Sequence, residues 1–282
     1  MTPVEVDDAV LAEMPLPDHG DTATKHERGV VLVIGGGRET PGAALLAGVA
    51  ALRVGAGKLQ IVISESAAPA LAAAIPEARV IGVPETDRGE LAAAAAPIVA
   101  ERAAGASAVL IGPGVLDRSG LEAIVPAVLD ATDGSVVLDA SAVSTLRRRD
   151  ARRPNVLAVP NPGELAELGF DDALAAAREL DVVVACRDAE TVIATPDGRA
   201  WIDRSGSVTL ATSGSGDVAS GAVAGLAARG ASRETAAVWG ARVHGVAGER
   251  LAARVGPLGV LARDLLDELP RVLTDLQANM RR

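Results

Sequence analysis

Short aliphatic runs alternate along most of the chain with longer segments of helical periodicity. Glycine, proline or aspartate follows several of these runs, and continuous aliphatic runs of this length are typical of strands buried on both faces of a parallel sheet. The expected strands cover residues 30–34, 59–63, 109–111, 136–138, 156–159 and 182–185. The pattern predicts a three-layer α/β/α fold with a largely parallel central sheet and helices on both faces.

The last third of the chain adds a hairpin and three helices to this pattern. Two short runs at 191–194 and 200–202 are separated by Thr195-Pro196-Asp197-Gly198-Arg199, which predicts a hairpin with a Pro-Asp-Gly turn. Helices are expected at 221–229, 233–253 and 258–279. Neither a linker rich in Pro, Gly or Ser nor an internal repeat interrupts the chain. We therefore expect residues 1–282 to form one domain, with no second enzyme domain fused to it.

The composition indicates which residues form the core and argues against a nucleic-acid partner. Apolar residues make up 49% of the chain and aromatic residues only 1%, so the core must consist of Val, Leu, Ile and Ala. Few aromatic platforms are present on which single-stranded nucleic acid could stack. The net charge is −10, and the arginines at 147–149 and 152–153 are interpreted as a solvated surface. No nucleic-acid partner is expected.

The single cysteine and the hydropathy pattern indicate a cytoplasmic protein. Cys186 excludes an internal disulfide and fits a reducing compartment, where it is expected to be a small buried apolar residue. No secretory signal is visible at the N-terminus. The most apolar windows, such as 91–100, are short and bounded by charge, so no membrane span is expected.

A glycine-rich stretch at 211–221 carries the most informative chemistry. It places Gly214, Gly216 and small hydroxyl residues around Asp217, on an expected loop at the N-terminus of a helix. The free N–H groups and the positive end of the dipole there favour an anion such as phosphate. A carboxylate at that place suits a base acting on a hydroxyl that attacks phosphorus. The alternative is a glycine-rich turn in which Asp217 caps or begins the helix.

The order of several weak motifs narrows the interpretation. Gly35-Gly36-Gly37 precedes 41–46 and 52–57, and Gly112-Pro113-Gly114, 160–164 and the 214–221 loop follow. In this order and spacing the chain resembles the ADP/ATP-dependent NAD(P)H-hydrate dehydratases of the ribokinase-like superfamily. The resemblance extends over nearly everything from Lys25 to the C-terminus.

The resemblance implies a metabolite-repair enzyme. The family removes water from NADH or NADPH that has become hydrated at the nicotinamide ring, at the expense of ADP or ATP. The resemblance implies action on the S epimer, Mg²⁺ as cofactor, release of AMP and phosphate, and cooperation with a separate NAD(P)H-hydrate epimerase. It also suggests a homo-oligomer.

The resemblance assigns the family's site residues to the matching positions of this chain. Asp217 matches the catalytic base, and Gly214 and Gly216 match its anion hole. The family's residues that contact the hydrate correspond to Ala43, Gly112, Gly114, Asn161 and Asp217. The nucleotide-binding loop matches Arg187, Asp188, Ala189, Glu190 and Thr191. Glu164 either helps to hold a hydrated Mg²⁺ or caps a helix after Pro162.

Two positions depart from the family pattern. Asn161 stands where the family has a histidine, and it can donate and accept hydrogen bonds without titrating. It is equally interpreted as a turn residue between two prolines. Arg187-Asp188 replaces Lys-Gly, which keeps the positive charge but changes its geometry. Both positions normally bind rather than catalyse in the family, so we expect altered affinity more than lost catalysis.

Two other functions are compatible with the same motifs. The chain could instead be a small-metabolite kinase of the hydroxyethylthiazole kinase type, or a nucleotide-binding protein that has lost its activity.

Two further polar residues have structural interpretations. His244 is expected to be a packed or hydrogen-bonded histidine rather than a ligand. Asp139, at the end of a strand, is interpreted either as a partner of a metal-linked water or as a loop residue.

Overall fold

The computed structural model describes residues 2–20, 22–147 and 155–280. Its sheet has the strand order β1-β10-β9-β8-β7-β6-β5-β2-β3-β4, and among the described strands only β9 runs antiparallel to its neighbours. The strands are β1 (Val4–Glu5), β2 (Val30–Ile34), β3 (Lys58–Ser64), β4 (Ala78–Val83), β5 (Ala108–Ile111), β6 (Ser135–Leu138), β7 (Val156–Ala158), β8 (Val183–Arg187), β9 (Thr191–Ala194) and β10 (Ala200–Asp203).

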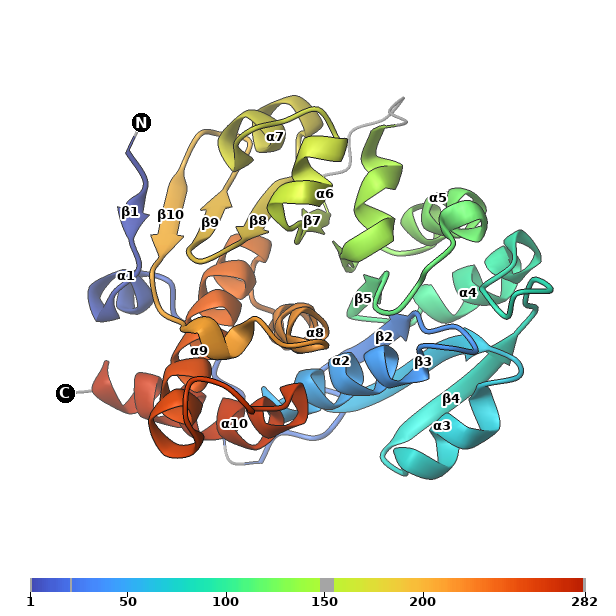
Figure 1. Ribbon diagram of the computed structural model, residues 1–282, viewed down its shortest axis with the longest axis horizontal. Helices are drawn as coiled ribbons and strands as arrows, with labels where there is room; N and C mark the ends of the chain where they lie inside the picture. The colour runs from blue at the N-terminus through green and yellow to red at the C-terminus, as the bar shows by residue number, and fades with distance from the viewer. Residues whose placement is uncertain (1, 21, 148–154, 281–282) are drawn as a thin grey trace.

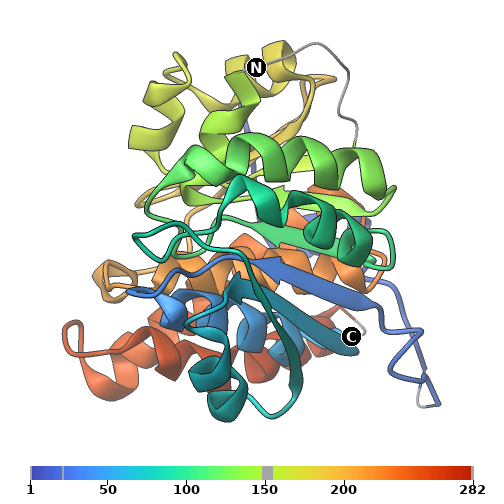
Figure 2. The same ribbon diagram turned by 90° about the vertical axis from the view of Figure 1, so that its right-hand side faces the viewer.

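Helices cover both faces of this sheet (Figures 1 and 2). They are α1 (Asp8–Glu13), α2 (Pro41–Arg53), α3 (Ala68–Ala74), α4 (Ala96–Ala103), α5 (Leu121–Ala131), α6 (Pro162–Glu167), α7 (Ala173–Leu180), α8 (Ser215–Ala228), α9 (Arg233–Val255) and α10 (Ala262–Asn279). Short 3-10 helices lie at Ala93–Ala95, Arg118–Gly120, Ala140–Arg147 and Val208–Leu210. The predicted three-layer α/β/α fold is confirmed.

Strand side chains alternate between two separate cores, as the period of a strand requires. Val31 and Val33 of β2 belong to the core on the side of α2 and α8, whereas Leu32 and Ile34 belong to the core on the side of α4 and α5. All four are fully buried. Both faces are covered, which explains why the central strands are continuous aliphatic runs.

Helix α8 runs through the middle of one helical layer, with α2 on one side and α9 on the other (Figure 1). A Cβ on Gly221 would lie only 2.2 Å from the carbonyl oxygen of Ala47, and a Cβ on Gly225 only 2.6 Å from that of Ala51. The backbones of α8 and α2 therefore touch, because glycine and alanine leave room for it. This close packing fixes the position of the N-terminus of α8.

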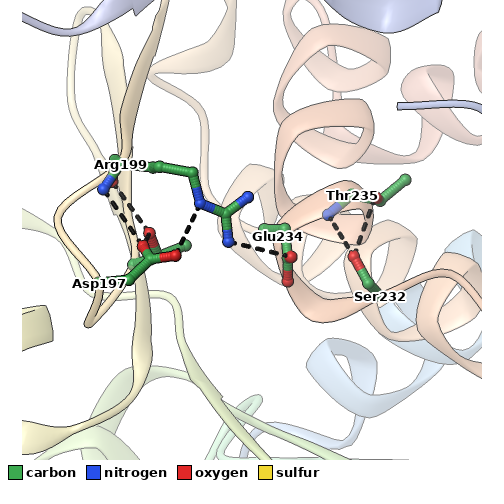
Figure 3. Close-up of polar contacts among 6 residues, drawn as sticks. Asp197, Arg199, Ser232, Glu234 and Thr235 are labelled. Carbon is green, nitrogen blue, oxygen red and sulfur yellow. Dashed lines mark hydrogen bonds and ion pairs between the residues drawn. The ribbon is translucent and has the colours of Figure 1, made fainter. Parts of the chain in front are cut away.

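The β9–β10 hairpin is tied to the N-terminal end of α9 (Figure 3). Asp197 in the turn accepts from Nε of Arg199 at 2.8 Å, and Nη2 of Arg199 lies 3.4 Å from Oε1 of Glu234. Ser232 caps α9 by accepting from the backbone N–H of Thr235 at 3.2 Å. The predicted Pro-Asp-Gly hairpin is confirmed, and these contacts hold it against α9.

The structure corrects the sequence-based elements at several places. Strand β4 was not expected, because it lies at the sheet edge, where only Val83 of its residues is buried and no continuous aliphatic run is needed. Helix α8 begins at Ser215 rather than at 221, and α10 begins at Ala262 rather than at 258. The arginines at 148–149 and 152–153 lie outside the described residues. No helix in the described part of the chain is long and apolar enough to span a membrane.

Candidate functional site

The carboxyl ends of the central strands meet at one edge of the sheet and carry the glycine loops. β2 lies between β3 and β5 although β5 follows β4 in the chain, so the strand order changes direction between β2 and β5. Loops at such a point diverge and leave a crevice. Gly35-Gly36-Gly37 follows β2 and meets the loop after β5, where the N–H of Gly36 donates to the carbonyl of Pro113 at 2.7 Å.

Three predicted substrate-binding residues lie together beside this crevice. A Cβ on Gly114 would lie 2.7 Å from the Cβ of Ala43 at the start of α2. Gly112 has φ +124°, and a Cβ there would lie 1.9 Å from the carbonyl oxygen of Asp139. Gly112 is thus required for the backbone after β5 to pack against the end of β6.

The N-terminus of α8 faces the same edge of the sheet. Gly214 is the N-cap residue with φ +88°, a conformation that glycine adopts readily, and it has no side chain with which to cap the helix. The N–H groups of the first helical turn have no intrahelical partner. Asp217 lies in this first turn rather than in a preceding loop. The arrangement suits an anion at the helix N-terminus.

Asp217 is half-buried, and none of the described residues donates a hydrogen bond to its carboxylate. Its pKa is raised from the usual 3.8 to about 6, mainly by burial and next by the negative charge of Asp139, while Arg187 lowers it. A carboxylate with a pKa slightly below neutral is ionised at pH 7 and is still basic enough to take a proton.

Arg187 and Asp139 form an ion pair next to Asp217. Nη2 of Arg187, at the end of β8, lies 2.6 Å from Oδ1 of Asp139, and it also donates to the carbonyl of Val159 at 3.1 Å. The Asp139 side chain is only 3% exposed. Asp139 follows the last residue of β6, as expected for a loop residue, and the structure adds a charge partner 48 residues away in the sequence.

A cavity of about 650 Å³ opens between the end of β8, the N-terminus of α8 and helix α9. Four of the five residues predicted to bind the nucleotide line it, and so does one residue of the predicted anion hole: Arg187, Asp188, Ala189, Thr191 and Gly216. Glu190 turns instead toward Arg204, whose Nη1 lies 2.6 Å from its carboxylate. Gly214 lies beside Leu46 and Ala262.

The cavity wall also contains residues that the sequence did not indicate. Ser205, Gly206 and Ser207 line the cavity after β10. The hydroxyl of Ser205 donates to the buried carboxylate of Asp203, and the N–H of Gly206 donates to Glu249 at 3.0 Å. No motif marked this loop, because its position depends on contacts with α9 rather than on its own sequence.

His244 is hydrogen-bonded as expected, and it also lines the cavity. Its Nε2 lies 3.0 Å from the hydroxyl of Ser215, the first residue of α8. Burial lowers the pKa of His244 to about 4, and the positive charge of Arg187 adds to this. The imidazole is therefore neutral at pH 7.

Asn161 and Glu164 form a capping box at the start of α6. The side chain of Asn161 accepts from the N–H of Glu164, and Oε2 of Glu164 accepts from the N–H of Asn161, both at 2.9 Å. The capping alternative for Glu164 is thus observed. Burial raises the pKa of Glu164, the bond from Asn161 lowers it, and the charge of Asp139 raises it again.

The described residues contain no group of three or more His, Cys, Asp or Glu that could hold a metal ion by itself. Glu164 is nevertheless an acidic group at this edge of the sheet, close enough to Asp139 for the charge of Asp139 to raise its pKa. Mg²⁺ is usually held by one or two carboxylates together with water and substrate phosphates. Glu164 therefore fits a Mg²⁺ that arrives bound to a nucleotide, whereas Asp139 is engaged with Arg187.

Cys186 is the free cysteine of the described chain and is half-buried beside the β8–β9 turn. Burial raises the pKa of its thiol to about 11, and the charge of Asp188 adds to this. The thiol is therefore protonated at pH 7, but the side chain is half-buried rather than buried as predicted.

Comparison with known proteins identifies the family. The family model for NAD(P)H-hydrate dehydratase matches residues 31–271. The chain is 43% identical over 279 residues to the ADP-dependent (S)-NAD(P)H-hydrate dehydratase of Xanthomonas campestris pv. campestris, covering 95% of each protein. It is 35% identical to the Bifunctional NAD(P)H-hydrate repair enzyme Nnr of Moorella thermoacetica and spans 54% of that protein.

A solved structure agrees with these matches. The crystal structure of the ADP/ATP-dependent NAD(P)H-hydrate dehydratase of Bacillus subtilis, co-crystallised with ATP and Mg²⁺, superposes with a TM-score of 0.81 at 29% identity. The alignment covers 98% of this chain and 99% of that one. The ribokinase-like fold expected from the motifs is thereby confirmed.

Proposed function

The chain belongs to the NAD(P)H-hydrate dehydratase family, and on that premise we propose that it restores NADH and NADPH from their S hydrates with ADP as the phosphoryl donor. The observation that carries the proposal is Asp217, whose raised pKa and position in the first turn of α8 suit a base beside a bound phosphate. The 43% identity to an enzyme of that name supports a dehydratase rather than a small-metabolite kinase.

The proposed reaction starts with proton transfer to Asp217. As Asp217 takes the proton of the ring hydroxyl, the hydroxyl oxygen bonds to the terminal phosphorus of ADP, and the bond between that phosphorus and the bridging oxygen breaks to release AMP. The lone pair of the ring nitrogen then expels phosphate, and loss of a proton from the adjacent carbon restores the double bond. Phosphorylation is needed because hydroxide is a poor leaving group and phosphate is a good one.

The two sides of the site would bind the two substrates. The terminal phosphate would lie at the N–H groups of Gly214, Gly216 and their neighbours, and the AMP part would occupy the cavity lined by the β8–β9 turn. The hydrated ring would lie between Asp217 and the crevice formed by Ala43, Gly112 and Gly114. Asn161 lies at the same edge of the sheet and would contact the substrate from the start of α6.

A magnesium ion bound to the nucleotide would be held by Glu164, with Asp139 nearby. When bound, it supplies positive charge that offsets the charge of the phosphates. Oε2 of Glu164 is engaged with the N–H of Asn161, so its other oxygen is the one free to face a hydrated ion.

The proposal includes three properties of the protein in its cell. An epimerase activity from another domain or protein would supply the S hydrate from the R form. We also place the protein in the cytoplasm as a homo-oligomer; cell fractionation and the mass in solution test these two points. The pure 282-residue chain should consume S hydrate and leave R hydrate until an epimerase is added. Equal consumption of both epimers would contradict the dependence on an epimerase.

The decisive experiment is incubation with hydrated NADH, Mg²⁺ and either ADP or ATP. We expect restored NADH absorbance together with equal amounts of AMP and phosphate when ADP is supplied. A phosphorylated metabolite in a substrate screen, without restored NADH, would indicate a kinase. Nucleotide binding with neither product would indicate a binding protein without catalysis.

A further inference from the structure

Arg187 is held in a fixed position at the junction of the proposed phosphate and substrate sites. Its Nη2 donates two hydrogen bonds, to Oδ1 of Asp139 at 2.6 Å and to the carbonyl of Val159 at 3.1 Å. Its side chain is 21% exposed, and its Nε is buried without a hydrogen-bond partner in the described structure. One side of the guanidinium is therefore anchored, while other donors on it remain available.

The available side of Arg187 faces the N-terminus of α8. A Cβ on Gly216 would lie 2.7 Å from Nη1 of Arg187, so the absence of a side chain at 216 is what lets the guanidinium lie against the first helical turn. Asp217 is the next residue, and the charge of Arg187 reaches it, since it lowers the pKa of that carboxyl. An anion held by the N–H groups of this turn would therefore also meet Arg187.

We propose that Arg187, fixed by Asp139, is a catalytic residue that contacts the transferred phosphoryl group and stabilises the charge it gains during transfer. This inference rests on the proposed function, and it changes the expected role of Arg187 from binding to chemistry. Asp139 is a positioning residue, because it holds the guanidinium without touching the phosphoryl group.

The physical reason is the fixed geometry of the donor. Charge spreads over the three outer phosphoryl oxygens as the bond to the leaving oxygen breaks, and an arginine placed beforehand stabilises this state without reorganising. An arginine that acts in this way typically contributes about 10³–10⁵-fold to turnover. A lysine offers one compact charge and cannot bind Asp139 and a phosphoryl oxygen with one planar fork.

Arg187→Lys and Arg187→Ala test the role by separating binding from chemistry. The readouts are ADP affinity by calorimetry and the single-turnover rate of NADH restoration at saturating ADP and S hydrate. We expect Arg187→Lys to bind ADP within a few-fold of the wild type but to react at least tenfold more slowly. Arg187→Ala should react about 10³-fold more slowly or worse, with partial rescue by added guanidinium ion. Arg204→Ala, in which an exposed arginine of the same hairpin region loses its pair with Glu190, is the matched control and should keep the wild-type rate.

Gly216→Ala supplies a second test that changes neither Arg187 nor Asp139. The three atoms nearest to the added methyl belong to the flexible end of Arg187, so the protein should fold, but the guanidinium must move away from α8. The rate should fall strongly in the wild-type background and only slightly in the Arg187→Ala background, because the two changes remove the same interaction. This coupling also keeps the proposal testable if Arg187→Ala, which leaves Asp139 buried and unpaired, folds poorly.

Two outcomes separate this proposal from the proposed function. If Arg187→Lys and Arg187→Ala raise the Michaelis constant for ADP but keep the wild-type rate at saturation, Arg187 only binds the nucleotide and the catalytic role is overturned. In that case the dehydratase activity itself still stands. If the wild-type protein restores no NADH with ADP or ATP, the proposed function fails instead.

Discussion

Replacing Asp217 by asparagine should make the protein more stable and almost inactive. The native carboxyl has a pKa of about 6, raised chiefly by burial and then by Asp139, against the usual 3.8 in an unfolded chain. The native state therefore holds this proton more tightly than the unfolded state. The contribution of Asp217 to stability therefore falls as the pH rises from about 4 to 6, and this loss persists at neutral pH.

The expected gain follows from the size of this shift. A rise of roughly two pKa units corresponds to about 3 kcal/mol, and solvent around the half-buried group reduces this to about 1–3 kcal/mol. Asparagine carries no charge, so Asp217→Asn should raise the free energy of unfolding by that amount at pH 7 and by almost nothing below pH 4. Turnover should fall about 10²–10⁴-fold, as expected when a general base is removed. ADP affinity should stay the same or increase, because a negative charge facing the phosphates is lost.

The assay is denaturant unfolding at a series of pH values, in parallel with NADH restoration from the hydrate. Asp197→Asn is the matched control, because hydrogen bonds from Thr195 and Arg199 lower the pKa of that exposed carboxyl. The control should lose stability rather than gain it, and should keep its activity. Near-native turnover of Asp217→Asn would refute the role of the base. Loss of both folding and activity would instead return Asp217 to a structural role in the first turn of α8.

The other predictions concern pH, the start of α6 and the packing of α8. Turnover of the wild type should decline below pH about 6, as protonation removes the base form of Asp217, and a pH profile without a group near 6 would contradict this assignment. Asn161→Ala should lower stability by about 1 kcal/mol, because the helix cap is lost, and should raise the Michaelis constant for the hydrate more than it lowers turnover. Asn161→His should keep or improve the affinity for the hydrate. Unfolding measurements report the change in stability, and steady-state kinetics report the changes in the Michaelis constant and turnover. Gly221→Ala should destabilise the fold by about 1–3 kcal/mol, because its Cβ would lie 2.2 Å from the carbonyl oxygen of Ala47. The control Gly105→Ala, whose Cβ would meet nothing within 4 Å, should leave the thermal unfolding almost unchanged.

Much of the central sheet could be predicted from the sequence, because its strands are buried on both faces. Residues 30–34 and 191–194 were predicted with the bounds that the structure has, and the other predicted strands differ by one or two residues at their ends. The start of α8 was missed by six residues, because Gly216 and the small polar residues of its first turn are poor helix formers in isolation. They are helical because α8 packs against α2 and α9.

The sequence by itself determined the fold class, the hairpin and the set of loops that carry chemistry, since aliphatic runs and glycine turns are local signals. It also singled out Asp217, because a lone carboxylate in a glycine loop is visible without a structure. Only the tertiary structure decided which charges meet across the site. Asp139 and Arg187 are 48 residues apart and His244 and Ser215 are 29 apart, yet each pair is within hydrogen-bond distance. Asp139 and Arg187 meet because parallel strands bring their carboxyl ends to one edge regardless of their separation in the chain, and His244 and Ser215 meet because α9 packs beside α8. Burial at this edge then raises the pKa of Asp217 to about 6.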